Sequence, residues 1–581
     1  MTSGPDDPYD ADDPFDPREA HDAAQGGPLG ATGEAFVRIA HDALDDLLRL
    51  DPVTATGLGD HRFDDRLPDR TPEGLDEARR VLSGWLGAVD AVDDTMLTVD
   101  HRVDHEMLRS ALSARLFELD DLRPYAWDPL AANPGTALYL LLARDFAPLA
   151  DRLRSVAGRL AAVPAALATA RTSLRDMPRV HVETALGQLR GTKALVGREV
   201  ADALMKEPAL RAEVEPARAA ALQAIDDHLA WLEATLSPGG PAGAERDPRL
   251  GPELYAAKLW HALDTETPPD SVLVRAESDL MRVEAEIADL VGGRDPRQVL
   301  DELADSGYVD DTTVLGLCAQ ALEETTAYVR AHELVGVPQR WDEGVRIIEM
   351  PEIHRGVAVA YCDAPGPLET ADLPTYFAVS PAPADWPPDQ VRSFYREYNA
   401  HQLRNLTVHE AMPGHVLQLA HSRKSARAAR AAEHGGRTPV RAALYSGPFV
   451  EGWAMYAEEV MVRAGFGGTA VALQQLKMQL RATINAILDV RVHAHGMTEV
   501  EAMALMTGRG HQEVGEAAGK WRRALLTSAQ LSTYYVGYSE VAELSRRLAD
   551  DRPHRSTQAR HDEMLAHGSP PPRHLRTLLG V

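Results

Sequence analysis

The sequence predicts a mainly α-helical protein that contains one small β-sheet. Long segments rich in Ala, Leu and Arg place apolar residues at steps of three and four, which is the period of an amphipathic helix. Residues 345–380 lack this helical periodicity and instead carry short β-rich runs separated by Pro and Gly. With 581 residues, the chain is long enough for several helical units or for one large helical body.

The helical segments form two groups. Residues 1–33 are acidic and rich in Pro and Gly, so we expect disorder there. An N-terminal helical part, residues 34–240, is followed by the Gly/Pro-rich segment 237–252, which favours a boundary. A second helical part, residues 241–581, contains the small sheet, and we expect the two parts to form one continuous body. Helical periodicity is clearest in residues 34–50, 150–174, 216–236 and 271–291.

Three runs within residues 345–380 are expected to be strands, namely Val345–Glu349, Val357–Tyr361 and Thr375–Val379. One interpretation is a hairpin that only stabilises the fold. The other is an edge strand beside a cleft, which could bind an extended peptide through backbone hydrogen bonds. The sequence leaves both open.

Composition excludes several classes of partner. The formal net charge of -28 argues against binding to nucleic acid or to an anionic membrane surface, since both need a basic patch. No apolar run reaches about 18 residues, and the N-terminus lacks a basic segment followed by an apolar one. Cys318 and Cys362 are the only cysteines, which fits a reducing compartment. We therefore expect a cytoplasmic protein that acts on a peptide or small molecule; a homodimer stays open.

The string "TVHEAMPGHVLQLAH" contains His409, Glu410 and His415, with the second histidine two residues later than in the zinc-hydrolase motif His-Glu-x-x-His. On an undistorted helix, His415 would lie about 120° from the face of His409. Pro413 interrupts helical hydrogen bonding and Gly414 adopts unusual backbone angles, so a bulge there could return His415 to that face. Ordinary histidines beside a kink are the alternative.

The string "FVEGWAMYAEEV" places Glu451 near a helix start in an apolar setting, where a carboxylate is costly unless it is paired or binds a metal. His409, His415 and Glu451 would offer two nitrogens and one oxygen to Zn²⁺ and leave a fourth position for water. Glu458 lies seven residues further on, at about the same helical face. It is a candidate partner behind the ligands, and a solvated helix glutamate is the alternative.

The string "KWRRALLTSAQLSTYYVGYSEV" is expected to form a helix that carries Arg523, Tyr534 and Tyr538. A phenol can stabilise an oxyanion, and an arginine can bind a substrate carboxylate through two parallel hydrogen bonds. Ordinary packing is the alternative for each. Asp489 and His493, four residues apart, could orient each other or reach the site, and a surface pair is the alternative.

These motifs together resemble the bacterial family named domain of unknown function 885, whose members are similar to thermostable zinc carboxypeptidases. The resemblance rests on "LRLDPVTATGLGDHRFDDRLPD", "HEAMPGH", "EGWAMYAEE", "AQLSTYYVG" and "HDEMLAHGSPPPRHLRTLL". It implies an elongated, helical, zinc-peptidase-like (gluzincin) fold with a small sheet beside an active-site cleft. It also implies zinc bound by His409, His415 and Glu451, with Glu410 as base. Tyr535 departs from the family pattern, which has Lys there, so substrate binding by that position is in doubt.

The expected function is zinc-dependent hydrolysis of peptide bonds, by a carboxypeptidase or small-peptide hydrolase. Glu410 would take a proton from water at the zinc and pass it to the leaving amine, while Tyr534 stabilises the oxyanion and Arg523 binds a terminal carboxylate. One alternative keeps the zinc but hydrolyses non-peptide amides or esters. Another is a non-catalytic helical binding protein with a degenerate site.

Overall fold

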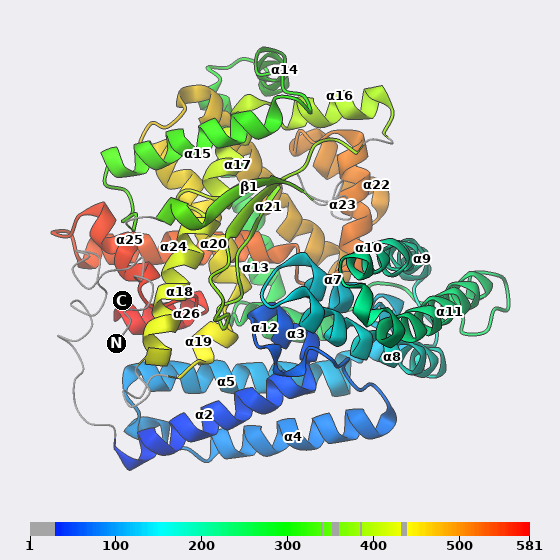
Figure 1. Ribbon diagram of the computed structural model, residues 1–581. Helices are drawn as coiled ribbons and strands as arrows, with labels where there is room; N and C mark the ends of the chain where they lie inside the picture. The colour runs from blue at the N-terminus through cyan, green and yellow to red at the C-terminus, as the bar shows by residue number, and fades with distance from the viewer. Residues whose placement is uncertain (1–29, 339–340, 351–359, 384–385, 432–437) are drawn as a thin grey trace.

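The structure is a computed structural model that describes residues 30–338, 341–350, 360–383, 386–431 and 438–581 (Figure 1). The described chain is mainly helical and contains a small sheet of three strands, which confirms the predicted fold class at this level. No described helix combines the length and the apolar character needed to cross a membrane.

The N-terminal part is built from helices that bury two apolar clusters. Its helices are α2 (Ala31–Leu50), α3 (Pro52–Leu58), α4 (Pro72–Asp90), α5 (Val99–Phe117), α6 (Pro124–Trp127), α7 (Gly135–Ala143), α8 (Leu149–Ser173), α9 (Arg179–Ala194), α10 (Val200–Lys206) and α11 (Arg211–Thr235). One cluster lies mainly among α2 to α5, and the other lies among α7 to α11. In Figure 1, α2, α4 and α5 lie together at the bottom of the view, and α8 to α11 lie together at its right. Most of the segment expected to be disordered lies outside the described residues, and α2 begins at Ala31.

The second part follows a segment without helix, between Thr235 and Pro252. Its helices are α12 (Pro252–Leu263), α13 (Pro269–Leu290), α14 (Pro296–Ser306), α15 (Val314–Ala331), α16 (Pro388–Glu397), α17 (Ala400–Glu410), α18 (His415–Ala431), α19 (Val440–Ala443), α20 (Gly447–Arg463), α21 (Gly468–His495), α22 (Glu499–Ala504), α23 (Val514–Leu526), α24 (Ser532–Asp551), α25 (Thr557–Leu565) and α26 (Pro572–Leu579). The long helix α21 is buried on all sides along most of its length, as expected for a helix in the centre of a large core.

The sheet consists of β1 (Val345–Glu349), β2 (Ala360–Asp363) and β3 (Thr375–Val379). The strand order is β1-β3-β2, with β3 parallel to β1 and antiparallel to β2. β1 and β3 have the predicted bounds, whereas the start of the predicted middle strand, residues 357–359, lies outside the described residues. Because β1 and β2 do not pair with each other, β2 is an edge strand, and its neighbour beyond that edge is α17.

Polar contacts join the two parts on either side of the candidate site. Arg144, at the end of α7, lies 2.8 Å from the carboxylate of Asp363 on β2 and donates a hydrogen bond to the carbonyl of Pro374. His181 on α9 lies within 3.0 Å of the carbonyl of Leu525 on α23. The N-terminal part therefore supports the edge strand and the end of α23.

Candidate metal centre

The two histidines of the motif lie on different helices. α17 ends at Glu410 and α18 begins at His415, so the four residues between them form a break, which replaces the bulged single helix that the sequence analysis expected. Pro413 has no N–H to continue the helix, and the Gly414 N–H instead donates to the carbonyl of Val408 at 2.9 Å. The chain thereby starts a new helix in a new direction.

This break has room for glycine alone at position 414. A Cβ placed there would lie 1.8 Å from the carbonyl oxygen of His409, which belongs to the backbone and cannot move independently. From the other side, the indole N–H of Trp453 on α20 donates to the carbonyl of Pro413 at 2.9 Å. The break is thus held between its own backbone and α20.

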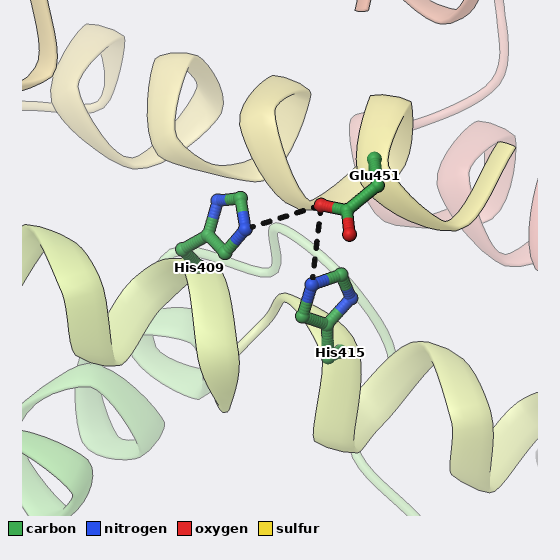
Figure 2. A group of neighbouring side chains, drawn as sticks. All are labelled: His409, His415 and Glu451. Atoms are coloured by element: carbon green, nitrogen blue, oxygen red, sulfur yellow. Dashed lines mark ion pairs between the residues drawn. The ribbon is translucent and has the colours of Figure 1, made fainter. Parts of the chain in front are cut away.

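His409, His415 and Glu451 converge from α17, α18 and α20 (Figure 2). The Nε2 atoms of His409 and His415 lie 3.5 and 3.6 Å from Oε2 of Glu451, and the three ligand atoms all lie within 4.8 Å of one another. Zn–N and Zn–O bonds of roughly 2.0–2.2 Å in tetrahedral geometry separate ligand atoms by about 3.4 Å. The two nitrogen–oxygen separations therefore fit a zinc ion between the three side chains.

Two buried polar atoms of this group have no hydrogen-bond partner among the described residues, namely Oε2 of Glu451 and Nδ1 of His415. Buried polar atoms are normally paired, so the carboxylate oxygen that faces both imidazoles needs a cation. This chemistry favours a bound metal ion at this position.

A second carboxylate lies behind His409. Oε1 of Glu458 lies 2.7 Å from Nδ1 of His409, and its other oxygen accepts a hydrogen bond from the side chain of Asn405 at 2.6 Å. Such a partner holds the ring so that Nε2 faces the metal position. Asn405 was missed by the sequence analysis, although its place four residues before His409, on the same helical face, is a signal that could have found it.

Glu410 lies against the edge of the sheet. Its Oε2 accepts a hydrogen bond from the backbone N–H of Cys362 on β2 at 3.0 Å, and the side chain is buried. Burial raises the pKa of Glu410, while His409 and His415 act to lower it. The sheet thus adjoins the motif, which answers the question of its location that the sequence left open.

Arg523 and Tyr534 lie on two helices, whereas the sequence analysis expected one. α23 ends at Leu526, because Thr527 is extended with φ -131° and ψ 155°. Ala529 then adopts a left-handed conformation with φ 63°, and α24 begins at Ser532. The negative charge of Glu451, together with burial, raises the pKa of Tyr534 to about 12, and a hydrogen bond from Arg523 acts in the opposite direction. Tyr534 therefore interacts with Arg523 and senses the charge of Glu451.

Two glycines bring Tyr534 close to Glu451. A Cβ on Gly452 would lie 2.4 Å from the backbone of Gly537, and a Cβ on Gly537 would lie 2.0 Å from the carbonyl of Pro448. The backbones of α20 and α24 therefore touch at this crossing. Glu451 directly precedes the first glycine, and Tyr534 lies one turn before the second.

Asp489 and His493 hold the segment between α23 and α24 and do not contact the three converging side chains. Asp489, which is fully buried, accepts hydrogen bonds from the N–H groups of Ala529 and Ser532 and from the Ser532 hydroxyl, at 2.7–3.2 Å. Nε2 of His493 lies 2.8 Å from the carbonyl of Thr527. The surface pair that the sequence left as an alternative is wrong, because both side chains are buried.

The other two tyrosines of α24 are engaged elsewhere. The hydroxyl of Tyr538 donates to Glu459 at 2.5 Å and accepts from Gln479 at 3.0 Å. The hydroxyl of Tyr535 donates to Asp279 on α13 at 2.7 Å. The position where the family pattern has Lys therefore faces α13, and Tyr538 packs in the same apolar cluster as Tyr534 with its hydroxyl bound to Glu459 and Gln479.

A family model described as "Bacterial protein of unknown function (DUF885)" matches residues 52–579. The chain belongs to the DUF885 family. A solved structure described as a "putative lipoprotein of unknown function" from Shewanella oneidensis is similar to this DUF885 protein, with a TM-score of 0.79 and 28% identity over 94% of this chain and 100% of that chain. A "putative lipoprotein" from Colwellia psychrerythraea has a TM-score of 0.75 and 15% identity, over 94% of this chain and 98% of that chain. No curated protein matches.

Proposed function

We propose that this DUF885 protein is a zinc-dependent hydrolase that cleaves peptide bonds, as a carboxypeptidase or a small-peptide hydrolase. The observation that supports it most is the convergence of His409, His415 and Glu451, with the carboxylate of Glu410 next to them. Kinship with the gluzincin peptidases belongs to the same proposal. It is supported by the helical fold and by the edge strand beside Glu410.

His409, His415 and Glu451 hold the zinc ion in this proposal. When bound, the ion supplies a Lewis acid that polarises a carbonyl group and lowers the pKa of water. Glu410 takes a proton from the attacking water at a carboxylate oxygen and delivers it to the leaving nitrogen. Glu458 accepts a hydrogen bond from the Nδ1–H of His409, which keeps the Nε2 lone pair directed at the metal position.

Substrate orientation comes from the second break and from the sheet. The phenol of Tyr534, whose pKa of about 12 keeps its proton at neutral pH, donates to the developing oxyanion. Arg523 binds the free carboxylate of a peptide C-terminus through its planar guanidinium. A peptide that binds beside β2 passes Glu410, because the N–H of Cys362 on this strand donates to the Glu410 carboxylate.

Elemental analysis of the native protein tests the metal site. We expect about one zinc ion per chain in the unmodified protein. Glu410→Gln should keep the zinc but lose most turnover. His415→Ala should lose the zinc. His401→Ala is a matched control, because His401 lies in the first turn of the same helix α17 and does not belong to the converging group. Full metal content in His415→Ala, or full activity in Glu410→Gln, contradicts the assignment.

Peptides with free and amidated C-termini test the carboxypeptidase part. For peptides with a free C-terminus, Arg523→Ala should lower kcat/KM by an amount equivalent to about 2 kcal/mol of transition-state stabilisation, the scale of a lost charge-assisted hydrogen bond. Amidated peptides should stay poor substrates. Arg522→Ala is the control, because Arg522 contacts Thr184 on α9 at 2.8 Å. Equal cleavage of both peptide types by the unmodified protein contradicts carboxypeptidase action. Cleavage of acylated small molecules alone would favour a hydrolase of non-peptide amides or esters.

The cytoplasmic location is also a proposal, supported by cysteine usage: Cys318 and Cys362 are both free. The two similar structures are described as lipoproteins, which is the competing location. Fractionation of cells that express the full chain decides between them, and recovery in the membrane fraction contradicts the proposal.

A further inference from the structure

One face of α23 carries a row of charged side chains. Glu516, Lys520 and Arg523 follow at spacings of four and three residues, which places them on one side of the helix. Ala517, Trp521 and Ala524 bury the adjoining side of the helix, about 100° further round, in the core. The charged face leads along the helix to Arg523, which contacts Tyr534.

At the Glu516 end of this face, the charges compensate one another. Glu397 is buried and accepts hydrogen bonds from Lys477 at 2.8 Å and from Arg481 at 2.9 Å. Arg481 also forms an ion pair with Glu516. Two carboxylates thus face two cations, and this end of the row needs no further anion.

Lys520 and Arg523 are different, because neither has a carboxylate partner in the part of the chain that the structure describes. Arg523 donates to the neutral amide of Gln530 at 3.0 Å and to the phenol of Tyr534. Burial of Lys520, with Arg481 and Arg523 nearby, lowers the pKa of its ammonium group to about 7. Lys520 and Arg523 share one face of α23 and lack a carboxylate partner among the described residues, so together they can receive an anion.

Building on the proposed hydrolase function, we propose that Lys520 and Arg523 together bind a dicarboxylate, which selects substrates that end in a glutamate or aspartate residue. Arg523 binds the α-carboxylate, and Lys520 binds the side-chain carboxylate. Residues three apart on a helix have Cβ atoms about 5–6 Å apart, a separation that suits two carboxylates joined by two or three carbon atoms. Lys520 is a specificity-determining residue here and does not take part in bond cleavage.

Matched peptides that end in Glu or Gln test this selectivity. The zinc-loaded protein should cleave the Glu peptide with at least about a tenfold higher kcat/KM, since the Gln peptide lacks the second charge. Lys520→Met should remove this preference by raising KM for the Glu peptide, with little change for the Gln peptide. Lys520→Arg should restore it, and Arg522→Met should leave it unchanged. Equal cleavage of both peptides by the unmodified protein, or an equal loss for both in Lys520→Met, overturns the proposal.

Calorimetric binding of glutarate and butyrate separates this proposal from the hydrolase function. Glutarate should bind the unmodified protein about tenfold more tightly than butyrate, and Lys520→Met should abolish the difference. If glutarate binds in this way but no peptide is cleaved, the dicarboxylate site stands and the proposed reaction fails. If peptides are cleaved without a preference for acidic ends and glutarate binds no better than butyrate, the dicarboxylate site fails alone. Thermal melting of Lys520→Met should match that of the unmodified protein, which shows that lost binding is not lost folding.

Discussion

The two breaks between helices at the candidate site are held in different ways. The break between α17 and α18 is held by a hydrogen bond of its own backbone, from the N–H of Gly414 to the carbonyl of Val408, and by the indole N–H of Trp453 on the neighbouring helix α20. The break between α23 and α24 is held from a distance, because Asp489 and His493 belong to the central helix α21. The first break positions the proposed metal ligands, and the second positions the proposed substrate-binding groups. Damage to the first should therefore remove the metal, whereas damage to the second should spare it.

The largest effect is expected for Gly414→Ala. The added methyl group would lie 1.8 Å from the carbonyl oxygen of His409, so the backbone of the break must shift. We expect a loss of about 3 kcal/mol in the free energy of unfolding together with loss of zinc, measured by denaturant titration and elemental analysis.

Gly519→Ala is the matched control for this substitution. A Cβ at Gly519 meets nothing within 4 Å, and the residue lies inside helix α23. Alanine there should raise the free energy of unfolding by about 0.5–1 kcal/mol and leave the metal in place. Similar behaviour of the two variants would show that the first break tolerates change and would remove the contrast.

Asp489→Asn should break the second junction alone. The carboxylate accepts hydrogen bonds from Ala529 and Ser532, and an amide can accept with one oxygen only. We expect a loss of about 2 kcal/mol in stability and at least about a tenfold loss in kcat/KM, with zinc content unchanged. Loss of zinc in this variant would mean that the two breaks are not independent.

Glu458→Gln sharpens the comparison within the first region. The substitution keeps the shape of the side chain but removes the charge that faces Nδ1 of His409. Zinc affinity should fall by roughly tenfold to a hundredfold, as measured by competition with a chelator. Unchanged affinity would show that the break alone orients the ring.

The smallest effect concerns pH. The pKa of Lys520 is lowered to about 7, so its positive charge is lost as the pH rises through that value, while the neighbouring Arg481 and Arg523 stay charged. The preference for Glu over Gln peptides should therefore fall a few-fold between about pH 6 and about pH 8. A preference that is constant over this range, or that is lost equally in Lys520→Met and Arg522→Met, contradicts this role of Lys520.

Periodicity and motif spacing predicted much of the fold and assembled the candidate ligands. The four clearest helical segments, two of the three strands and the group His409, His415 and Glu451 follow from patterns within a few residues. The ends of α17 and α23 did not follow. Periodicity reports the buried face of a helix, but where a helix stops depends on hydrogen bonds, and those of the second break come from Asp489, about forty residues earlier.

The same limit explains the residues that the sequence did not reveal. Lys520 looked like any helix lysine, because the lack of a carboxylate partner among the described residues is a property of the folded chain. Asp489 and His493 were recognised as a pair, yet their task became visible only once the segment they hold was in place. Polar residues that act through distant backbone atoms leave no periodic trace in a sequence.

The touching glycines of α20 and α24 also constrain how this protein can change over generations. Alanine at position 452 would clash with the backbone of Gly537, and alanine at position 537 would clash with the carbonyl of Pro448. Moving the helices apart would carry Glu451 away from the histidines and Tyr534 away from Glu451 in the same step. If the proposed function holds, a single substitution at either glycine removes activity, so both glycines should persist in lineages that keep the activity and be lost together in those that do not.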